Sequence, residues 1–191
     1  MLLGRIATQV AYMQDKPEVG ICGGNIRIID SNGNYVPERD KIRTHRRLNF
    51  DDIFLNTKSG IPAPTLLFRR KALEDVGCFD TEIKLEDLLI ELKITHAGYV
   101  IDVLEDVLAQ YRIHGSNTYK NYQFMIDNVL RTYSKYQDHP DYSKARSRFI
   151  NSMALKCARK DKKLARELLK QLPFRSWDSK SLRAIMRLFF S

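Results

Sequence analysis

Cysteine is scarce in this chain, which has 191 residues and three cysteines. Cys22, Cys78 and Cys157 are far apart, and none belongs to a CxxC motif or to a cluster of cysteine and histidine. This spacing argues against a disulfide framework and against a zinc site of the usual type. Cysteines without such partners are typical of a reducing compartment, so we expect a cytoplasmic protein.

Long hydrophobic runs are absent as well. No stretch reaches the roughly 18 apolar residues that a transmembrane helix needs. The opening residues, MLLGRIATQVAYMQ, include Arg5 and repeat their apolar side chains at helical spacing, which is not the pattern of a signal peptide. The sequence therefore predicts no membrane-spanning segment.

The chain also lacks a glycine-rich phosphate loop. Residues 23–25 read GGN, but the spacing fits neither GxGxxG nor GxxxxGK, and the triplet lies inside a strand pattern. Close packing of the backbone explains these glycines better than phosphate binding does.

Positive charge is concentrated in the last third of the chain. Residues 119–191 carry 17 lysines and arginines against 6 acidic residues, whereas residues 1–118 carry 15 against 17. A basic helical segment can bind nucleic acid, but no RRM, zinc-finger or clear helix-turn-helix signature is present. We therefore expect no nucleic-acid partner and regard the charge as solvated helix surface.

Periodicity and turn residues divide the chain into an α/β part and a helical part. Residues 31–34, SNGN, predict a turn in which Asn32-Gly33 suits a positive φ. Residues 35–47 are polar and predict an exposed loop. Expected helices cover 3–14, 48–56, 70–77, 85–97, 119–137, 141–159, 161–171 and 179–190, and expected strands cover 19–30, 61–70, 99–103 and 107–114.

Two adjacent acids, Glu86 and Asp87, stand at the start of the helix expected over 85–97. They can stabilise the helix end through its dipole, an effect worth about 0.3–1 kcal/mol. They can also be the carboxylates of an active site. Taken alone, the pair favours the first interpretation. A leucine face, formed by Leu85, Leu88, Leu89 and Leu92, is expected to fix the helix and leave both acids away from the core.

Three blocks in a fixed order change that balance: PEVGICGGNIRIIDSNG, then PAPTLLFRRKALEDVGCFD, then LEDLLIELKITHAGYVIDVLEDVLAQYRIHGSN. Together they resemble family-2 glycosyltransferases of the GT-A fold over about residues 1–118. The resemblance implies an α/β fold, with a partial GT-A-like (Rossmann-like) mixed sheet and flanking helices over 1–117. A basic all-helical region over 118–191 would follow it.

The resemblance implies catalytic roles for the acidic pair and a role for one histidine. Asp87 matches the catalytic base of inverting members, and Glu86 matches its usual neighbour. His114, in YRIHGSN, matches a position near the diphosphate that ligates the metal in some members. A satisfied histidine at the end of a strand is the competing interpretation. Mg²⁺ or Mn²⁺ is the expected cofactor of a complete enzyme.

Substrate contacts are expected from two further segments. Residues 60–65, which include Pro64 and Thr65, match the segment beside the acceptor in the family. Arg112 stands two residues before His114, so both side chains point to one face of a strand. Its guanidinium can bind a phosphate oxygen. A surface ion pair is the alternative.

One departure from the family is large. Members carry an N-terminal half with a Rossmann-like nucleotide-binding unit and an Asp-x-Asp metal motif, and this sequence contains no Asp-x-Asp. It thus resembles the acceptor-side half of such an enzyme. We expect the isolated chain to transfer no sugar and to have an open sheet edge. Such edges self-associate, so we also expect homo-oligomers.

The expected function is inverting transfer of a sugar from a nucleotide-sugar donor to a saccharide or lipid-linked hydroxyl, in bacterial cell-surface polysaccharide synthesis. The alternative is a non-catalytic module that binds saccharide or a partner protein. The last helix adds a third question: Leu182, Ile185, Met186 and Phe189 share a face, with Arg183 and Arg187 outside it. Packing within the helical region is favoured over peripheral contact with an anionic membrane.

Overall fold

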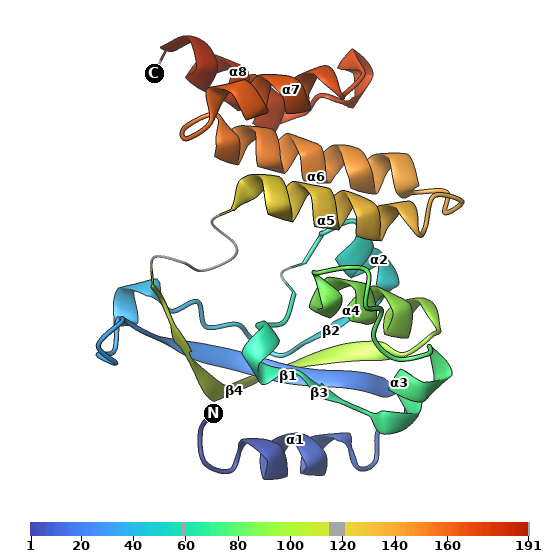
Figure 1. Ribbon diagram of the computed structural model, residues 1–191. Helices are drawn as coiled ribbons and strands as arrows, with labels where there is room; N and C mark the ends of the chain where they lie inside the picture. The colour runs from blue at the N-terminus through green and yellow to red at the C-terminus, as the bar shows by residue number, and fades with distance from the viewer. Residues whose placement is uncertain (59, 115–120, 191) are drawn as a thin grey trace. The chain divides into compact units, whose positions relative to one another are not determined.

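The computed structural model describes residues 1–58, 60–114 and 121–190. Contacts within the chain divide it into two compact units, Met1–Thr118 and Tyr119–Ser191. The first unit combines a sheet with helices, and the second is built from helices (Figure 1). The α/β class with a mixed sheet, which the sequence predicts, is therefore confirmed.

The sheet of the first unit has four strands in the order β2-β4-β1-β3. The two long central strands, β1 (Val19–Ile29) and β4 (Val100–Arg112), are parallel. The short strand β2 (Arg46–Leu48) pairs antiparallel with β4, and β3 (Leu67–Phe68) pairs antiparallel with β1. Both edges of the sheet are thus formed by strands of two or three residues.

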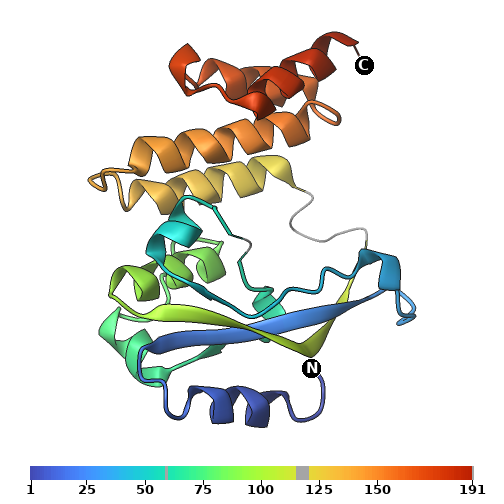
Figure 2. The same cartoon turned by 180° about the vertical axis from the view of Figure 1, so that it is seen from behind.

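Helices cover both faces of this sheet. The first helix, α1 (Arg5–Met13), lies on one face, and α2 (Phe50–Phe54) and α4 (Glu86–His96) lie on the other (Figure 2). Helix α3 (Arg70–Asp75) follows β3 directly and contacts α4. Buried side chains of β1 and β4 lie at the centre of the unit, among them Ile21, Ile101 and Val103. Val19 packs with Met13, Cys22 and Leu104 in a cluster beside α1.

The structure corrects three details of the expected elements. The single strand β4 (Val100–Arg112) replaces the two strands expected over 99–103 and 107–114, although the exposed pair Glu105-Asp106 suggests a break. Shifts in the β1–β4 register absorb the irregularity without ending the strand. The strand expected over 61–70 is reduced to β3, preceded by a 3-10 turn (Ala63–Thr65).

The third correction concerns residues 35–47, which the sequence predicts as an exposed loop. A 3-10 turn (Pro37–Arg39) and the start of β2 lie within this segment. Pairing with β4 creates the strand, so the local sequence gives little warning of it. The turn expected at SNGN is present, and Gly33 has the positive φ of 94° that it requires.

Close backbone packing at GGN is confirmed. A Cβ added to Gly23 would lie 2.4 Å from Cγ2 of Ile61 and 2.9 Å from Oγ1 of Thr65. A Cβ on Gly24 would lie 2.6 Å from the carbonyl oxygen of Asp106. The two glycines therefore let neighbouring segments approach β1 more closely than any side chain allows.

The second unit contains the helices expected from the periodicity, slightly shorter at their ends: α5 (Tyr122–Ser134), α6 (Tyr142–Cys157), α7 (Lys162–Lys170) and α8 (Ser179–Phe190). Side-chain caps begin three of them, because Asn121 accepts from the N–H of Phe124, Asp161 from that of Leu164 and Asp178 from that of Ser181. A core of its own holds the unit together, including Ile150, Cys157, Leu168 and Ala184.

Helix α8 buries a different face from the one that the sequence suggests. Ser181 and Ala184 are fully buried, whereas Leu182, Met186 and Phe189 are 58%, 53% and 77% exposed. Of the four apolar residues grouped in the sequence, only Ile185 packs against the core. Packing within the unit, the favoured expectation, therefore leaves most of this apolar face uncovered. In the described part of the chain, no helix combines the length and the apolar character needed to cross a bilayer.

Candidate functional site

The acidic pair stands at the first turn of α4, as the sequence predicts. Glu86 and Asp87 are the first two residues of the helix, and Leu85 precedes them without a side-chain cap. Glu86 is exposed and Asp87 is half-buried. The Oδ1 atom of Asp87 accepts a hydrogen bond of 2.8 Å from the N–H of Leu88. A carboxylate at this end of a helix interacts favourably with the helix dipole.

The buried surface of α4 extends beyond the leucine face that the sequence predicts. Leu89 and Leu92 are buried as expected, while Leu85 and Leu88 are half-buried. Further buried positions surround the helix: Ile90, Glu91, Ile94 and Thr95. The acid among them is the unexpected member, because a carboxyl group in an apolar interior loses its hydration.

The carboxyl group of Glu91 lacks a hydrogen-bond or ion-pair partner among the described residues. Its side chain is 7% exposed, and among the described residues nothing donates a hydrogen bond to the carboxyl or forms an ion pair with it. Burial, and to a lesser extent the nearby Asp87 carboxylate, raise the pKa of Glu91 to about 8. The group is therefore a neutral acid at pH 7, one helical turn from Asp87.

The segment that opens at Gly60 lies against this acid. A Cβ built on Gly60 would be 3.9 Å from Oε2 of Glu91. The carbonyl oxygen of Gly60 accepts a hydrogen bond of 3.4 Å from Nη2 of Arg46, on β2. Gly60 thus links a residue of α4 with a residue of the sheet edge.

Arg46 is a second buried polar group that lacks a full set of partners. Its Nε–H has no acceptor among the described residues. Burial, with a smaller effect of the nearby Arg43, lowers the pKa of its guanidinium. Buried polar groups in native structures are nearly always hydrogen-bonded. The Arg46 Nε–H and the Glu91 carboxyl, both beside the loop at Gly60, therefore have capacity for a further hydrogen-bond partner.

The arrangement places an accessible carboxyl group at a helix start and a buried, protonated carboxyl group one turn later. Two nearby acids in such different surroundings are a combination that acid–base chemistry uses. The protonated acid and the arginine N–H donate hydrogen bonds, and the carboxylate accepts them. A molecule rich in hydroxyl groups satisfies both kinds of partner.

Pro64 and Thr65 lie in the same segment as Gly60 but have different surroundings. Pro64 is exposed, and its carbonyl oxygen accepts a hydrogen bond of 2.7 Å from Nη1 of Arg5. Thr65 is fully buried, and its hydroxyl donates to the Pro62 carbonyl at 2.8 Å and accepts from the Gly24 N–H at 3.1 Å. Thr65 fixes the end of the segment against β1, and substrate contact by either residue stays a prediction.

Arg112 and His114 lie at the far end of β4. Both are exposed. Arg112 donates through Nη1 to the carbonyl oxygens of Asp30 and Ser31, at 3.1 and 2.9 Å, so its guanidinium supports the turn after β1. Within the described residues, no three histidine, cysteine, aspartate or glutamate side chains converge in a way that could hold a metal ion. A metal-binding role for His114 therefore stays a prediction.

A buried ionic network occupies the opposite face of the sheet. Asp102 is fully buried and accepts two hydrogen bonds of 2.8 Å from Arg47 and one of 2.9 Å from the Tyr12 hydroxyl. His45 contacts the same hydroxyl at 2.9 Å, and Glu18 forms an ion pair with Arg47 at 3.1 Å. Because its partners are all present, this network is a structural one.

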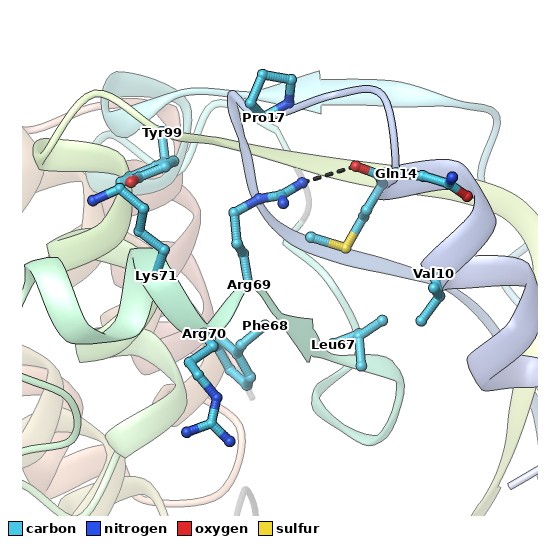
Figure 3. Close-up of a pocket in the computed structure, with 10 residues that line it drawn as sticks. Val10, Gln14, Pro17, Leu67, Phe68, Arg69, Arg70, Lys71 and Tyr99 are labelled. Carbon is cyan, nitrogen blue, oxygen red and sulfur yellow. Dashed lines mark hydrogen bonds between the residues drawn. The ribbon is translucent and has the colours of Figure 1, made fainter.

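A mainly apolar pocket of about 720 Å³ lies at the β3 edge. Figure 3 shows its lining from α1, β3 and α3, with Arg69 reaching across toward the end of α1. Arg69 donates to the carbonyl oxygens of Val19, Met13 and Lys16, at 2.9, 2.8 and 2.9 Å. These bonds tie the helix to the sheet, and the pocket contains no candidate acid–base pair.

No protein-family model matches the chain, and a search among curated proteins finds no match to it. The resemblance to family-2 glycosyltransferases therefore depends on the order of the three sequence blocks.

Sequence reasoning missed Glu91 and Arg46. A signal for Glu91 was present, because an acid four residues after Asp87 lies among apolar positions of one helix. No comparable signal marks Arg46, which is one of several basic residues in a polar stretch and becomes buried only through β2 pairing.

Proposed function

We propose that this chain provides the acceptor-binding and proton-accepting side of an inverting, sugar-nucleotide-dependent glycosyltransferase. One observation carries the proposal: Asp87 is accessible at the start of α4, and the unpaired Glu91 carboxyl lies beside Gly60 one turn further on. The family resemblance assigns the base to the first of these residues and the acceptor to the segment that begins at the glycine.

In the proposed reaction, an acceptor hydroxyl oxygen bonds to the anomeric carbon of the donor sugar. The bond from that carbon to the nucleotide diphosphate breaks, and the diphosphate leaves with its electron pair. Asp87 takes the hydroxyl proton, a contribution typically worth about 10²–10⁴-fold in rate. Bacterial cell-surface polysaccharide synthesis is the setting that the resemblance implies, and the acceptor is a saccharide or a lipid-linked saccharide.

Glu91 and Arg46 have binding roles in this proposal. The protonated Glu91 donates a hydrogen bond to a sugar oxygen, and the Arg46 Nε–H donates a second. Neither group moves a proton in the reaction. Leaving such buried donors unpaired costs about 1–3 kcal/mol each, so a ligand that pairs with them gains affinity.

The first test is calorimetric titration of the full chain with a panel of oligosaccharides. Glu91→Ala is expected to weaken saccharide binding about tenfold, which corresponds to the loss of one hydrogen bond of about 1.4 kcal/mol. The matched control is Glu74→Gln, which changes an exposed acid on α3. If no saccharide of the panel binds, or if both variants weaken binding equally, the acceptor site is not here.

The second test separates an enzyme from a saccharide-binding module. Titration with a nucleoside diphosphate plus Mn²⁺ should show little binding to the chain alone, because the donor-binding motif has no counterpart in its sequence. Transfer is then measured after fusion to a nucleotide-binding domain of the GT-A type. Saccharide binding without transfer by any such fusion supports the module instead.

A further inference from the structure

The helical unit contains a cavity of about 690 Å³ that has no part in the proposed reaction. It lies between the first half of α6 and the segment formed by residues 173–178, which includes a 3-10 turn (Phe174–Ser176). All of its lining belongs to the second unit. Its volume is within the range of about 300–1,000 Å³ that is usual for small-molecule sites.

The lining is strongly basic. Four cationic side chains border the cavity against one carboxylate, Asp178; the cations are Lys144, Arg146, Arg148 and Arg175. Hydroxyl groups are present on both sides, from Ser143 and Ser147 of α6 and from Ser176 of the opposite segment. The cavity therefore offers many hydrogen-bond donors and an excess of positive charge.

The single acid does not neutralise these cations, because it is used elsewhere. Oδ1 of Asp178 accepts hydrogen bonds from the N–H groups of Lys180 and Ser181, at 2.8 and 3.2 Å, and so caps the start of α8. No ion pair joins Asp178 to Arg148 or Arg175 in the described residues.

Two of the four cations have other partners. Lys144 pairs with Asp141 at 3.5 Å, and Nη2 of Arg146 donates to Oε1 of Gln171 at 3.4 Å. Arg148 and Arg175 form no ion pair or side-chain hydrogen bond among the described residues. They stand on opposite walls, one on α6 and one on the 3-10 turn. Like charges that border one cavity repel each other, and an anion between them would relieve this repulsion.

Buried polar contacts hold the two walls in place. Asn151, on α6, is buried and donates from Nδ2 to the Ser176 carbonyl oxygen at 2.9 Å. Its Oδ1 atom accepts a hydrogen bond from the Ser181 hydroxyl, on α8. The backbone segments that carry the two arginines are thus held together by buried hydrogen bonds.

We propose that this cavity binds a phosphate-bearing ligand between Arg148 and Arg175. Arginine forms paired, charge-assisted hydrogen bonds with phosphate oxygens, and the serine hydroxyls supply further donors around them. A soluble phosphorylated compound and a phospholipid headgroup share this chemistry. The site is separate from Asp87 and Glu91, so it does not depend on the proposed transferase function.

The experiment titrates the full chain calorimetrically with inorganic pyrophosphate and, separately, with a water-soluble short-chain phosphatidic acid below its micelle concentration. The test variant is Arg148→Gln/Arg175→Gln, in which two exposed side chains lose their charge. The control is Arg159→Gln/Lys163→Gln, which removes the same charge at exposed positions outside the cavity. Circular dichroism verifies that both variants fold.

Binding that the test variant weakens at least tenfold, and that the control leaves within about twofold, supports the site. Pyrophosphate binding indicates a soluble ligand, and binding of phosphatidic acid alone indicates a lipid headgroup. The proposal is overturned if neither compound binds, or if both double variants weaken binding equally, since general positive charge would then explain the result. Failure of saccharide binding at Glu91 would leave this outcome unaffected.

Discussion

Glu91 lies one helical turn after Asp87 on α4, and the two carboxyl groups have opposite surroundings. Asp87 is half-exposed at the helix start, while Glu91 is buried beside Gly60 without a partner among the described residues. Burial raises the pKa of Glu91 to about 8, so folding takes up a proton at neutral pH. This difference has a measurable effect on stability.

Stability should fall as the pH rises, and Glu91→Gln should remove the effect. The unfolded chain releases the Glu91 proton near pH 4.5, whereas the folded chain holds it until about pH 8. Between pH 5 and pH 8 the wild type should therefore lose roughly 3 kcal/mol through this group. Urea unfolding at both pH values measures the loss. A variant with the same pH slope as the wild type would contradict the buried-acid interpretation.

Asp87→Asn should abolish most sugar transfer in a fusion that carries a donor-binding domain. The amide keeps the shape of the side chain but cannot accept the hydroxyl proton, so kcat should fall by about 10²–10⁴-fold with KM little changed. Glu86→Gln, at the exposed neighbour, is the matched comparison and should have a smaller effect. Full activity of the Asn variant would exclude Asp87 as the base.

Asp102→Asn should destabilise the first unit by about 2 kcal/mol, since it weakens three hydrogen bonds to a buried carboxylate. Burial by itself would raise the pKa of Asp102, but the bonds from Arg47 and Tyr12 outweigh it and lower the pKa. Its stabilising effect is present above the ordinary aspartate pKa and is lost as the pH falls through the lowered native value. Acid unfolding of the wild type, Asp102→Asn and the exposed control Asp51→Asn tests this pH dependence.

The β3 edge should promote self-association. Leu67 and Phe68 form the outermost strand, and no described strand pairs with its outer side. An open edge beside an apolar pocket is a surface on which a second copy can add a strand. Light scattering should detect dimers or larger oligomers, which Leu67→Lys reduces and Ile42→Lys, in an exposed loop, does not. A clean monomer at all concentrations would show the expectation to be wrong.

The exposed face of α8 should bind anionic bilayers. Leu182, Met186 and Phe189 are exposed together, and basic side chains flank them on α7 and α8. Such a helix rests in the interface of a negatively charged membrane and is released by salt. Co-sedimentation with phosphatidylglycerol vesicles should be lost in Met186→Ser/Phe189→Ser. The control is Ile6→Ser/Val10→Ser, at exposed positions of α1, and equal losses in both would indicate non-specific adsorption.

Much of the fold is predictable from the sequence because the patterns are local. The amphipathic spacing of the four C-terminal helices and the apolar run of β1 determine those elements almost by themselves. The single strand β4 is not predictable in this way, since Glu105-Asp106 has the composition of a turn. Only the parallel pairing with β1, and the register shifts opposite its glycines, keep that strand continuous.

The candidate site, like the fold, was predictable from the sequence only where the signal is local. Glu86 and Asp87 could be found because a helix start is visible in the sequence. Glu91 was marked only by its place among the apolar residues of the same helix. Arg46 had no such signal, since its half-buried position is on a strand that pairs with a segment distant along the chain. Thr65 shows a further limit: the resemblance implies a substrate contact, and the structure adds that the hydroxyl holds its segment against Gly24, which the sequence does not reveal.

Two adjacent residues of the short strand β2 make contacts on opposite faces of the sheet. Side chains alternate along a strand, so Arg46 approaches Gly60 on one face while Arg47 meets Asp102 on the other. A slip of one residue against β4 would exchange the two guanidiniums, leaving one buried anion without its counter-ion and bringing the wrong cation toward α4. Substitutions in the preceding loop that loosen this register can therefore impair the proposed sugar binding and the folding together, even though they touch neither acid of α4.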